Sequence, residues 1–282
     1  LGTSDMKAFL ALAIAASREL RAEDMQEPLI ILATADEETS MAGAQALVDR
    51  RLPQARHAII GEPTGLRPVN MHKGMMMEAI RLQGRSGHSS DPALGNSALE
   101  AMYSVLGALR EWRNELQQQH HDASFAVPVP TLNLGHIHGG DNANRICPEC
   151  ELHIDLRPLP GMDPQQLREE LRYRTLAVLR DSGIQASFEA LFEGVPAMQT
   201  PASATIVQLA EKLTGHSPEA VAFGTEAPYL NQLGMETVVL GPGDIDQAHQ
   251  PDEYLALERL TPTLEILTRM INTICIKQHP LL

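Results

Sequence analysis

The sequence predicts an α/β protein with a doubly wound, mainly parallel sheet and an inserted ferredoxin-like α+β domain. Two observations carry this prediction. Short apolar runs alternate with helical patterns at both ends of the chain, as in parallel sheets covered by helices. The middle of the chain has longer alternating runs in the order strand, helix, strand, strand, helix, strand. The expected boundaries are residues 1–70 and 193–282 for the first domain and 71–192 for the insertion.

The first domain is expected to open with an amphipathic helix whose apolar stripe carries Leu10, Ala13 and Ile14. The uninterrupted apolar run Leu29–Ala35 is typical of a fully buried parallel strand. The other elements expected in this domain are helices at 40–51, 202–213 and 258–276 and strands at 58–60 and 237–240. In the inserted domain, strands are expected at 75–82, 131–136, 151–157 and 186–190 and helices at 98–116 and 165–179.

The composition restricts the kinds of partner. A formal net charge of −14, from 36 acidic and 22 basic residues, argues against nucleic acid or an anionic membrane and favours a small molecule. No apolar run approaches membrane length, and residues 1–7 lack a signal peptide's pattern. The three cysteines fit a reducing compartment, and we therefore expect a cytoplasmic protein.

Acidic and imidazole side chains follow the ends of several predicted strands. Glu38 ends the acidic triplet after the first strand, Glu62 and His249 follow two others, and Asp5 precedes a helix. Such positions converge at one edge of a doubly wound sheet, where carboxylates with an imidazole suit zinc, cobalt or manganese. Taken singly, Asp5 also fits a helix N-cap, and His249 fits a surface residue.

Six motifs occur in the order of a known family. They are Gly2–Lys7, Ala35–Glu38, Gly61–Thr64, Ser86–Ser90, Asn144–Ile146 and Ala248–Asp252. The series resembles the di-metal deacylase and aminopeptidase family, which includes acetylornithine deacetylase, succinyl-diaminopimelate desuccinylase, aminoacylase and carboxypeptidase G. Within that family, residues 32–43 and 133–141 most resemble the acetylornithine-deacetylase members.

The resemblance implies a role for each of these side chains. Asp5 would bridge two divalent metal ions, Glu62 would bind the first ion, and Glu38 and His249 would bind the second. Glu37 would be the general base that takes a proton from the attacking water and passes it to the leaving amine. Zinc or cobalt is the metal expected from the resemblance.

The inserted domain is expected to act as a lid and to form a homodimer. In dimeric relatives, the residue matching His88 reaches the neighbouring subunit's site and stabilises the oxyanion there. Asn144 and Arg157 match substrate-holding positions, with Arg145 a weaker candidate. Alternation places Arg157 on the face opposite the apolar residues of its strand. Thr225 is expected to contact substrate, or to serve only as a turn residue.

One expected motif is absent. The family carries a His-x-Asp motif ahead of the segment that contains Asp5, and this sequence has none there. We therefore expect a truncated chain whose first metal site lacks a histidine ligand, with part of the sheet missing and activity impaired.

The expected reaction is hydrolysis of N-acetylornithine to ornithine and acetate, as in arginine synthesis. Desuccinylation of N-succinyl-diaminopimelate or a broader N-acyl-amino-acid deacylation is the alternative within the family. An alternative of another class is a non-catalytic fragment that serves as a binding or dimerisation module.

Overall fold

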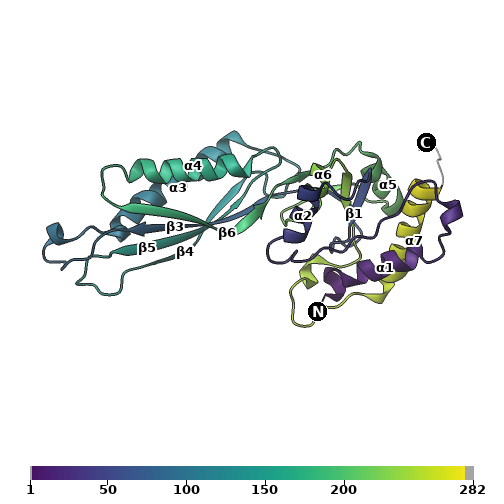
Figure 1. Cartoon of the computed structure of the whole chain (residues 1–282), viewed down its shortest axis with the longest axis horizontal. Coiled ribbons are helices and arrows are strands. Elements are labelled where there is room, and N and C mark those ends of the chain that lie inside the picture. Colours follow the sequence, from purple (N-terminus) through teal and green to yellow (C-terminus); the bar gives the residue numbers. More distant parts are fainter. Residues whose placement is uncertain (1, 277–282) are drawn as a thin grey trace. The chain divides into compact units, whose positions relative to one another are not determined.

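The computed structural model describes residues 2–276, which form two compact units (Figure 1). Unit 1 consists of the residues up to His72, Met198–Val221 and the residues from Thr225 onward. Unit 2 consists of Lys73–Ala197 and Ala222–Gly224. The sequence-based boundaries, after residues 70 and 192, lie within a few positions of these divisions.

Unit 1 is built on a mixed five-stranded sheet in the order β1-β9-β2-β7, with β8 beside β2. Its strands are β1 (His57–Ile60), β2 (Val69–His72), β7 (Met198–Gln199), β8 (Glu219–Val221) and β9 (Glu236–Val239). β1 is parallel to β9 and β2 to β8, whereas β2 is antiparallel to β9 and β7. The α/β class is confirmed, but the sheet is mixed rather than mainly parallel. The connection from β1 to β2 is too short to hold a crossover helix, so these two strands run in opposite directions.

Helices cover both faces of this sheet. They are α1 (Ala8–Ser17), α2 (Ala42–Arg50), α5 (Thr205–Thr214), α6 (Ala227–Gln232) and α7 (Leu260–Ile271). In β9, Val238 belongs to the apolar cluster formed with α5 and α7. Its neighbour Val239 belongs to the cluster that contains α6. Because successive strand residues face opposite sides, β9 is apolar on both faces and central to the unit.

Helix α1 packs on α7 with a different face from the predicted one. Phe9 and Ala16 are buried against Leu267, whereas Ile14 is 50% exposed. The helix is apolar almost all round, so its sequence does not single out one stripe. The predicted stripe was therefore wrong in part, although the helix itself is confirmed.

The apolar run Leu29–Ala35 is not a strand. Residues 27–34 have no regular secondary structure, and Ile30, Ile31 and Leu32 are 47%, 41% and 40% exposed. A strand is defined by its hydrogen-bonded neighbours, and within residues 2–276 no other segment pairs with this one. The prediction of a fully buried parallel strand was wrong for this reason.

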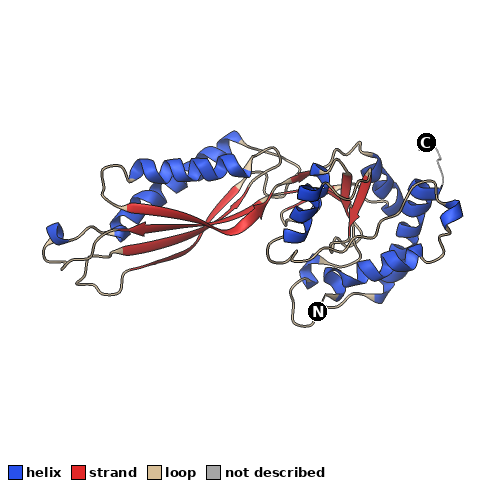
Figure 2. Cartoon of the chain, in the orientation of Figure 1, coloured by secondary structure: helices blue, strands red, loops and turns tan. Residues whose placement is uncertain are grey.

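Unit 2 is a four-stranded antiparallel sheet in the order β4-β5-β3-β6. Its elements in chain order are β3 (Met75–Gln83), α3 (Ala98–Gln119), β4 (Thr131–Gly139), β5 (Glu149–Arg157), α4 (Pro164–Val178) and β6 (Gln185–Val195). This is the predicted ferredoxin-like order, and both helices lie on one face of the sheet (Figure 2). Leu152, Ile154 and Leu156 are buried under the helices, which leaves Arg157 on the other face as expected.

Short turns complete the described chain. The 3-10 turns are Ala22–Asp24, Pro92–Leu94, Ile245–Gln247 and Leu257–Arg259, and the π turns are Thr3–Lys7 and Asn272–Ile276. Among residues 2–276, no helix is both long and apolar enough to cross a membrane.

Candidate metal centre

Unit 1 brings together three of the predicted metal ligands. One ligand atom from each of Asp5, Glu38 and His249 lies within 4.8 Å of the other two. The Nε2 atom of His249 lies 3.0 Å from a carboxylate oxygen of Glu38 and 3.5 Å from one of Asp5. Within the described residues, this is the one group of three acidic, histidine or cysteine side chains close enough to share an ion.

A tight turn presents Glu37 and Glu38. The carbonyl oxygen of Asp36 accepts hydrogen bonds from the N–H groups of Thr39, Ser40 and Met41. Asp36 has a φ of 61°, a left-handed conformation that aspartate adopts more readily than most residues. Asp36 therefore shapes the turn that presents the next two residues.

Asp5 is positioned by a side chain from the far end of the chain. The Glu253 carboxylate accepts hydrogen bonds from the backbone N–H groups of Gly2, Ser4 and Asp5, at 2.5, 2.6 and 3.0 Å. The hydrogen bond from the Asp5 N–H is the largest of the contributions that hold the pKa of Glu253 below its ordinary value. Asp5 therefore keeps its place ahead of α1 without belonging to that helix.

Glu62 follows β1 and lies deeper than the other acids. It is 8% exposed. The preceding Gly61 lies under the Phe9 ring, where a Cβ atom would come within 2.0 Å of that ring. Glycine is therefore required for α1 to approach the end of β1.

The carboxylates raise one another's pKa values. Burial, followed by the charge of Glu38, raises the pKa of Glu37 from its usual 4.5 to about 7, and the nearby His249 acts in the opposite direction. Burial, followed by the charges of Glu37 and Asp5, holds the pKa of Glu62 well above its ordinary value. So much negative charge in one place is unfavourable unless a cation neutralises it.

The donor set fits a divalent ion. Ligands about 2.1 Å from one tetrahedral ion lie roughly 3.4 Å from each other. The separations of 3.0 and 3.5 Å from the His249 nitrogen bracket that value. Two carboxylates and an imidazole are the mixed oxygen and nitrogen donors that zinc, cobalt and manganese accept.

The sequence interpretation missed one acidic residue beside this cluster. One oxygen of Glu226 accepts a hydrogen bond from the Thr34 hydroxyl at 2.7 Å, and the other is buried without a hydrogen-bond partner among the described residues. Burial raises the pKa of Glu226. A carboxylate soon after a strand was the signal that identified Glu62, but β8 has three residues and was not recognised as a strand.

Thr225, the neighbour of Glu226, has a structural role. Its side chain is buried, and its hydroxyl oxygen accepts a hydrogen bond from the Ala227 N–H at 3.1 Å. The same oxygen lies 3.1 Å from Nε2 of His72, which also accepts the N–H of Thr225 at 3.3 Å. The turn interpretation fits these contacts, and contact between Thr225 and substrate stays a prediction.

In unit 2, His88, Asn144 and Arg145 come together beyond the end of β3. His88 and Arg145 form an isolated antiparallel bridge, and the Ser89 N–H donates to the Asn144 carbonyl at 3.0 Å. His88 Nδ1 lies 2.7 Å from the Ser90 hydroxyl. The Arg145 Nε donates to a carboxylate oxygen of Asp141 at 3.0 Å.

Arg157 lies at the opposite end of the same sheet. Its neighbour Leu156 pairs with Met76 at the start of β3, whereas the His88 loop follows Gln83 at the end of β3. Eight strand steps separate these ends, which is roughly 27 Å at about 3.4 Å per residue. The Arg157 Nε donates to both oxygens of Asp155, at 2.9 and 3.0 Å. One copy of unit 2 therefore does not bring Arg157 and Asn144 to the same small molecule.

The fold defined by these two units occurs in known peptidases. An aminopeptidase from Bacillus cereus matches 96% of this chain and 71% of its own, with a TM-score of 0.74 and 20% identity. A dinuclear metal-binding M20 peptidase from Bacillus subtilis matches 95% of this chain and 72% of its own, with a TM-score of 0.65 and 17% identity. These similarities establish the fold class as that of the M20 peptidases.

The family follows from the sequence. The model of peptidase family M20/M25/M40 matches residues 1–273, and the chain belongs to this family. An acetylornithine deacetylase from Edwardsiella ictaluri is 48% identical over 275 residues, which are 98% of this chain and 72% of that protein. The acetylornithine deacetylase of Pasteurella multocida is 47% identical over 275 residues, which are again 98% of this chain and 72% of that protein. The predicted family is therefore confirmed.

Proposed function

We propose that the chain is a metal-dependent amidohydrolase that cleaves N-acetylornithine to ornithine and acetate. The convergence of Asp5, Glu38 and His249 is the observation that carries the proposal. Identity of about half with acetylornithine deacetylases supports the choice of substrate. A small acyl amino acid is the partner, and the expected cytoplasmic location stays a prediction.

We propose that two divalent ions, zinc or cobalt, bind at this cluster. When bound, such ions polarise the amide carbonyl and lower the pKa of a water molecule at neutral pH. Asp5 would lie between the two ions, with Glu38 and His249 on one side and Glu62 on the other. The Glu62 side has fewer ligands among the described residues, so we expect one ion to bind tightly and the second weakly.

Glu37 is the proposed general base. It adjoins the proposed ligand Glu38, and burial, the largest cause of the rise in its pKa, suits a group that accepts and returns a proton near neutral pH. Replacing Glu37 with glutamine keeps the shape of the side chain but removes the base. We expect Glu37→Gln to retain metal binding and to lose turnover, whereas the exposed control Glu19→Gln should retain both.

Unit 2 is the proposed lid and dimerisation domain, with unit 1 the metal-binding domain. The distance between Arg157 and the group of His88, Asn144 and Arg145 supports a homodimer in which a site takes Arg157 from one chain and the other group from its partner. The open edge of β4 and the 80% exposed Tyr103 on α3 are the proposed contact. Tyr103→Glu should weaken the dimer in sedimentation experiments. The matched control Tyr173→Glu, on α4, should leave the dimer unchanged.

Mixing two inactive variants tests the shared site. We expect His88→Ala and Arg157→Ala to be inactive alone. If the groups come from different chains, random dimers of the two would restore about a quarter of the wild-type activity, because one site in four keeps both groups. A mixture as inactive as its parents would contradict the shared site.

The substrate assignment has a direct assay. The rate of ornithine release from N-acetylornithine should exceed the rate of cleavage of N-succinyl-diaminopimelate or other N-acyl amino acids. Equal rates would contradict the assignment of N-acetylornithine as the substrate. A non-catalytic binding module is the alternative of another class. Tight binding of one ion without any turnover would favour that alternative.

A further inference from the structure

Glu226 presents a buried, unpaired carboxylate oxygen beside the candidate metal centre. The Thr34 hydroxyl donates a hydrogen bond to one of its oxygens at 2.7 Å. The other oxygen is shielded from solvent, and no residue that the structure describes donates to it. Such an oxygen is unfavourable, because burial removes the water that would otherwise solvate its charge. The side chain therefore lacks a donor, and a cationic donor suits it best.

The chain on both sides of Glu226 is held in place. Thr225 and Ala227 are fully buried, and the Thr225 hydroxyl accepts the Ala227 N–H at 3.1 Å. Nε2 of His72 accepts the N–H of Thr225 at 3.3 Å. These contacts fix the direction in which the Glu226 side chain points, and the Thr34 hydroxyl then orients its carboxylate.

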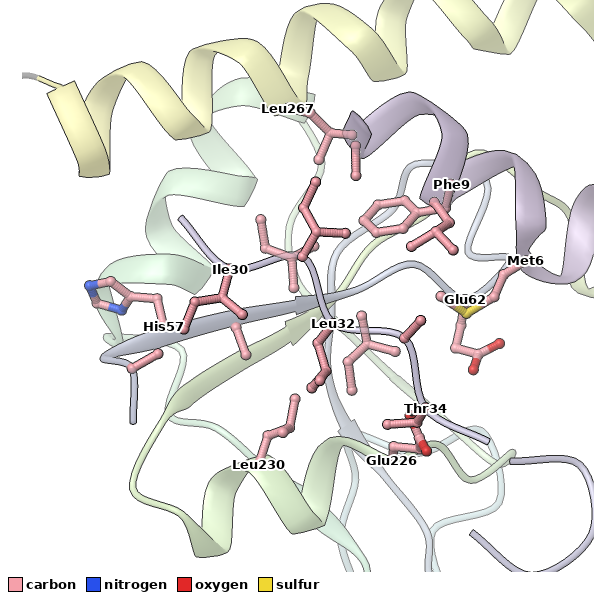
Figure 3. Close-up of a pocket in the computed structure, with 18 of the residues that line it drawn as sticks. Met6, Phe9, Ile30, Leu32, Thr34, His57, Glu62, Glu226, Leu230 and Leu267 are labelled. Carbon is pink, nitrogen blue, oxygen red and sulfur yellow. Dashed lines mark hydrogen bonds between the residues drawn. The ribbon is translucent and has the colours of Figure 1, made fainter. Parts of the chain in front are cut away.

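Glu226 lines the same pocket as the candidate metal centre. Glu226, Thr34 and Glu62 lie together at one end of this pocket (Figure 3). Burial and the charge of Glu38 are the largest causes of the raised pKa of Glu37, and the charge of Glu226 comes next. Glu226 is nevertheless not one of the three side chains close enough to share an ion. It therefore lies beside the metal ligands, where it can contact a part of the substrate away from the amide that is cleaved.

The proposed substrate has a charge that matches this oxygen. N-acetylornithine carries a single positive charge, which is the ammonium at the end of its side chain. The extended side chain places this ammonium roughly 7 Å from the acetyl carbon that water attacks. The ammonium therefore needs an acidic partner beside the metal centre and not within it, and Glu226 has that position.

We propose that Glu226 determines the specificity of the site, by binding the side-chain ammonium of N-acetylornithine with its unpaired oxygen. The inference rests on the proposed function, since it names the residue of that site that recognises the side chain. The ammonium supplies both the missing donor and a compensating charge. An uncharged side chain of the same length would leave the oxygen unpaired. N-succinyl-diaminopimelate has a carboxylate beside its terminal ammonium, and Glu226 would repel that carboxylate.

A matched pair of ligands tests the proposal. N-acetylnorleucine has a methyl group where N-acetylornithine has the ammonium, so the two ligands differ chiefly in charge. Calorimetry on the Glu37→Gln chain with added zinc measures their binding without interference from turnover. N-acetylornithine should bind at least about tenfold more tightly than N-acetylnorleucine. Adding Glu226→Gln should remove this preference by weakening the binding of N-acetylornithine alone.

Variants of Thr34 separate recognition from a structural role. Thr34→Val removes the hydroxyl that orients Glu226 and should reduce the preference, whereas Thr34→Ser keeps a hydroxyl and should retain it. The exposed control Glu19→Gln should leave the preference unchanged.

The outcomes for Glu226 and for the proposed function can be told apart. A preference for N-acetylornithine that survives Glu226→Gln would overturn the role of Glu226 and leave the proposed function intact. Equal weakening of both ligands by Glu226→Gln would indicate a structural role and would also overturn it, as would equal binding of the two ligands before that substitution. The proposed function fails separately, if the wild-type chain releases no ornithine from N-acetylornithine.

Discussion

The metal-free protein should become less stable as the pH rises from about 5 to about 8 because of Glu37. Burial and neighbouring carboxylates, Glu38 first, raise the pKa of Glu37 from the usual 4.5 to about 7. The folded state therefore binds this proton more tightly than the unfolded state does. The resulting stability is fully present below pH 4.5 and is lost as the pH rises through about 7.

The magnitude follows from the pKa. A rise from 4.5 to about 7 corresponds to about 3.5 kcal/mol at about 1.4 kcal/mol per pKa unit. Glu37 retains some contact with solvent, so we expect a loss of about 2 kcal/mol. Urea unfolding in the presence of a chelator at pH 5, 6, 7 and 8 measures it. Glu37→Gln should make the profile less steep without removing its slope, because the raised pKa values of Glu62 and Glu226 act in the same direction. Glu19→Gln should leave the profile as it is, and a slope that Glu37→Gln leaves unchanged would refute the reasoning.

Three further outcomes are expected. Arg168→Met should destabilise unit 2 by about 3–5 kcal/mol in urea unfolding, because it leaves the buried Glu78 carboxylate without the guanidinium that lies 2.6 Å away. The double variant with Glu78→Met should regain most of the lost unfolding free energy. Additive losses from the two substitutions would contradict the pairing. Cys150 and Cys275 should react slowly with a thiol reagent at pH 8 until the protein is unfolded, because burial raises both pKa values; rapid labelling of the native protein would count against their burial. Added zinc should raise the melting temperature of the wild type but not of His249→Ala, and an equal rise in both would remove His249 from the ligand set.

The sequence predicts the elements of unit 2 because its strands are long and alternate regularly between buried and exposed residues, even though β3 pairs with strands far along the chain. In β5 the alternation of Leu152, Ile154 and Leu156 identifies both the strand and its buried face. In unit 1 the same kind of pattern fails at Leu29–Ala35. An apolar run specifies a strand only if another segment pairs with it, and that information is not local.

The candidate site was predictable where an acidic residue follows a recognisable strand. Glu62 follows β1, which the sequence indicates clearly, whereas Glu226 follows the three-residue β8, which has no periodicity to detect. Thr225 was a candidate because it is a polar residue in a predicted loop, but its hydroxyl is buried in contact with His72, which is 153 positions away. Contacts of this range are set by the tertiary fold and not by local sequence.

The hydrogen bond between the Asp5 N–H and Glu253 also has a consequence for the order of folding. It joins residues 248 positions apart, and closing an open loop of that length costs about 5 kcal/mol. Unit 2 occupies much of this interval, and Met75 and Val195 pair near its two ends. Once unit 2 has folded, the two halves of unit 1 are separated by a much shorter effective loop. The metal centre should therefore assemble late in refolding, after the inserted sheet has formed.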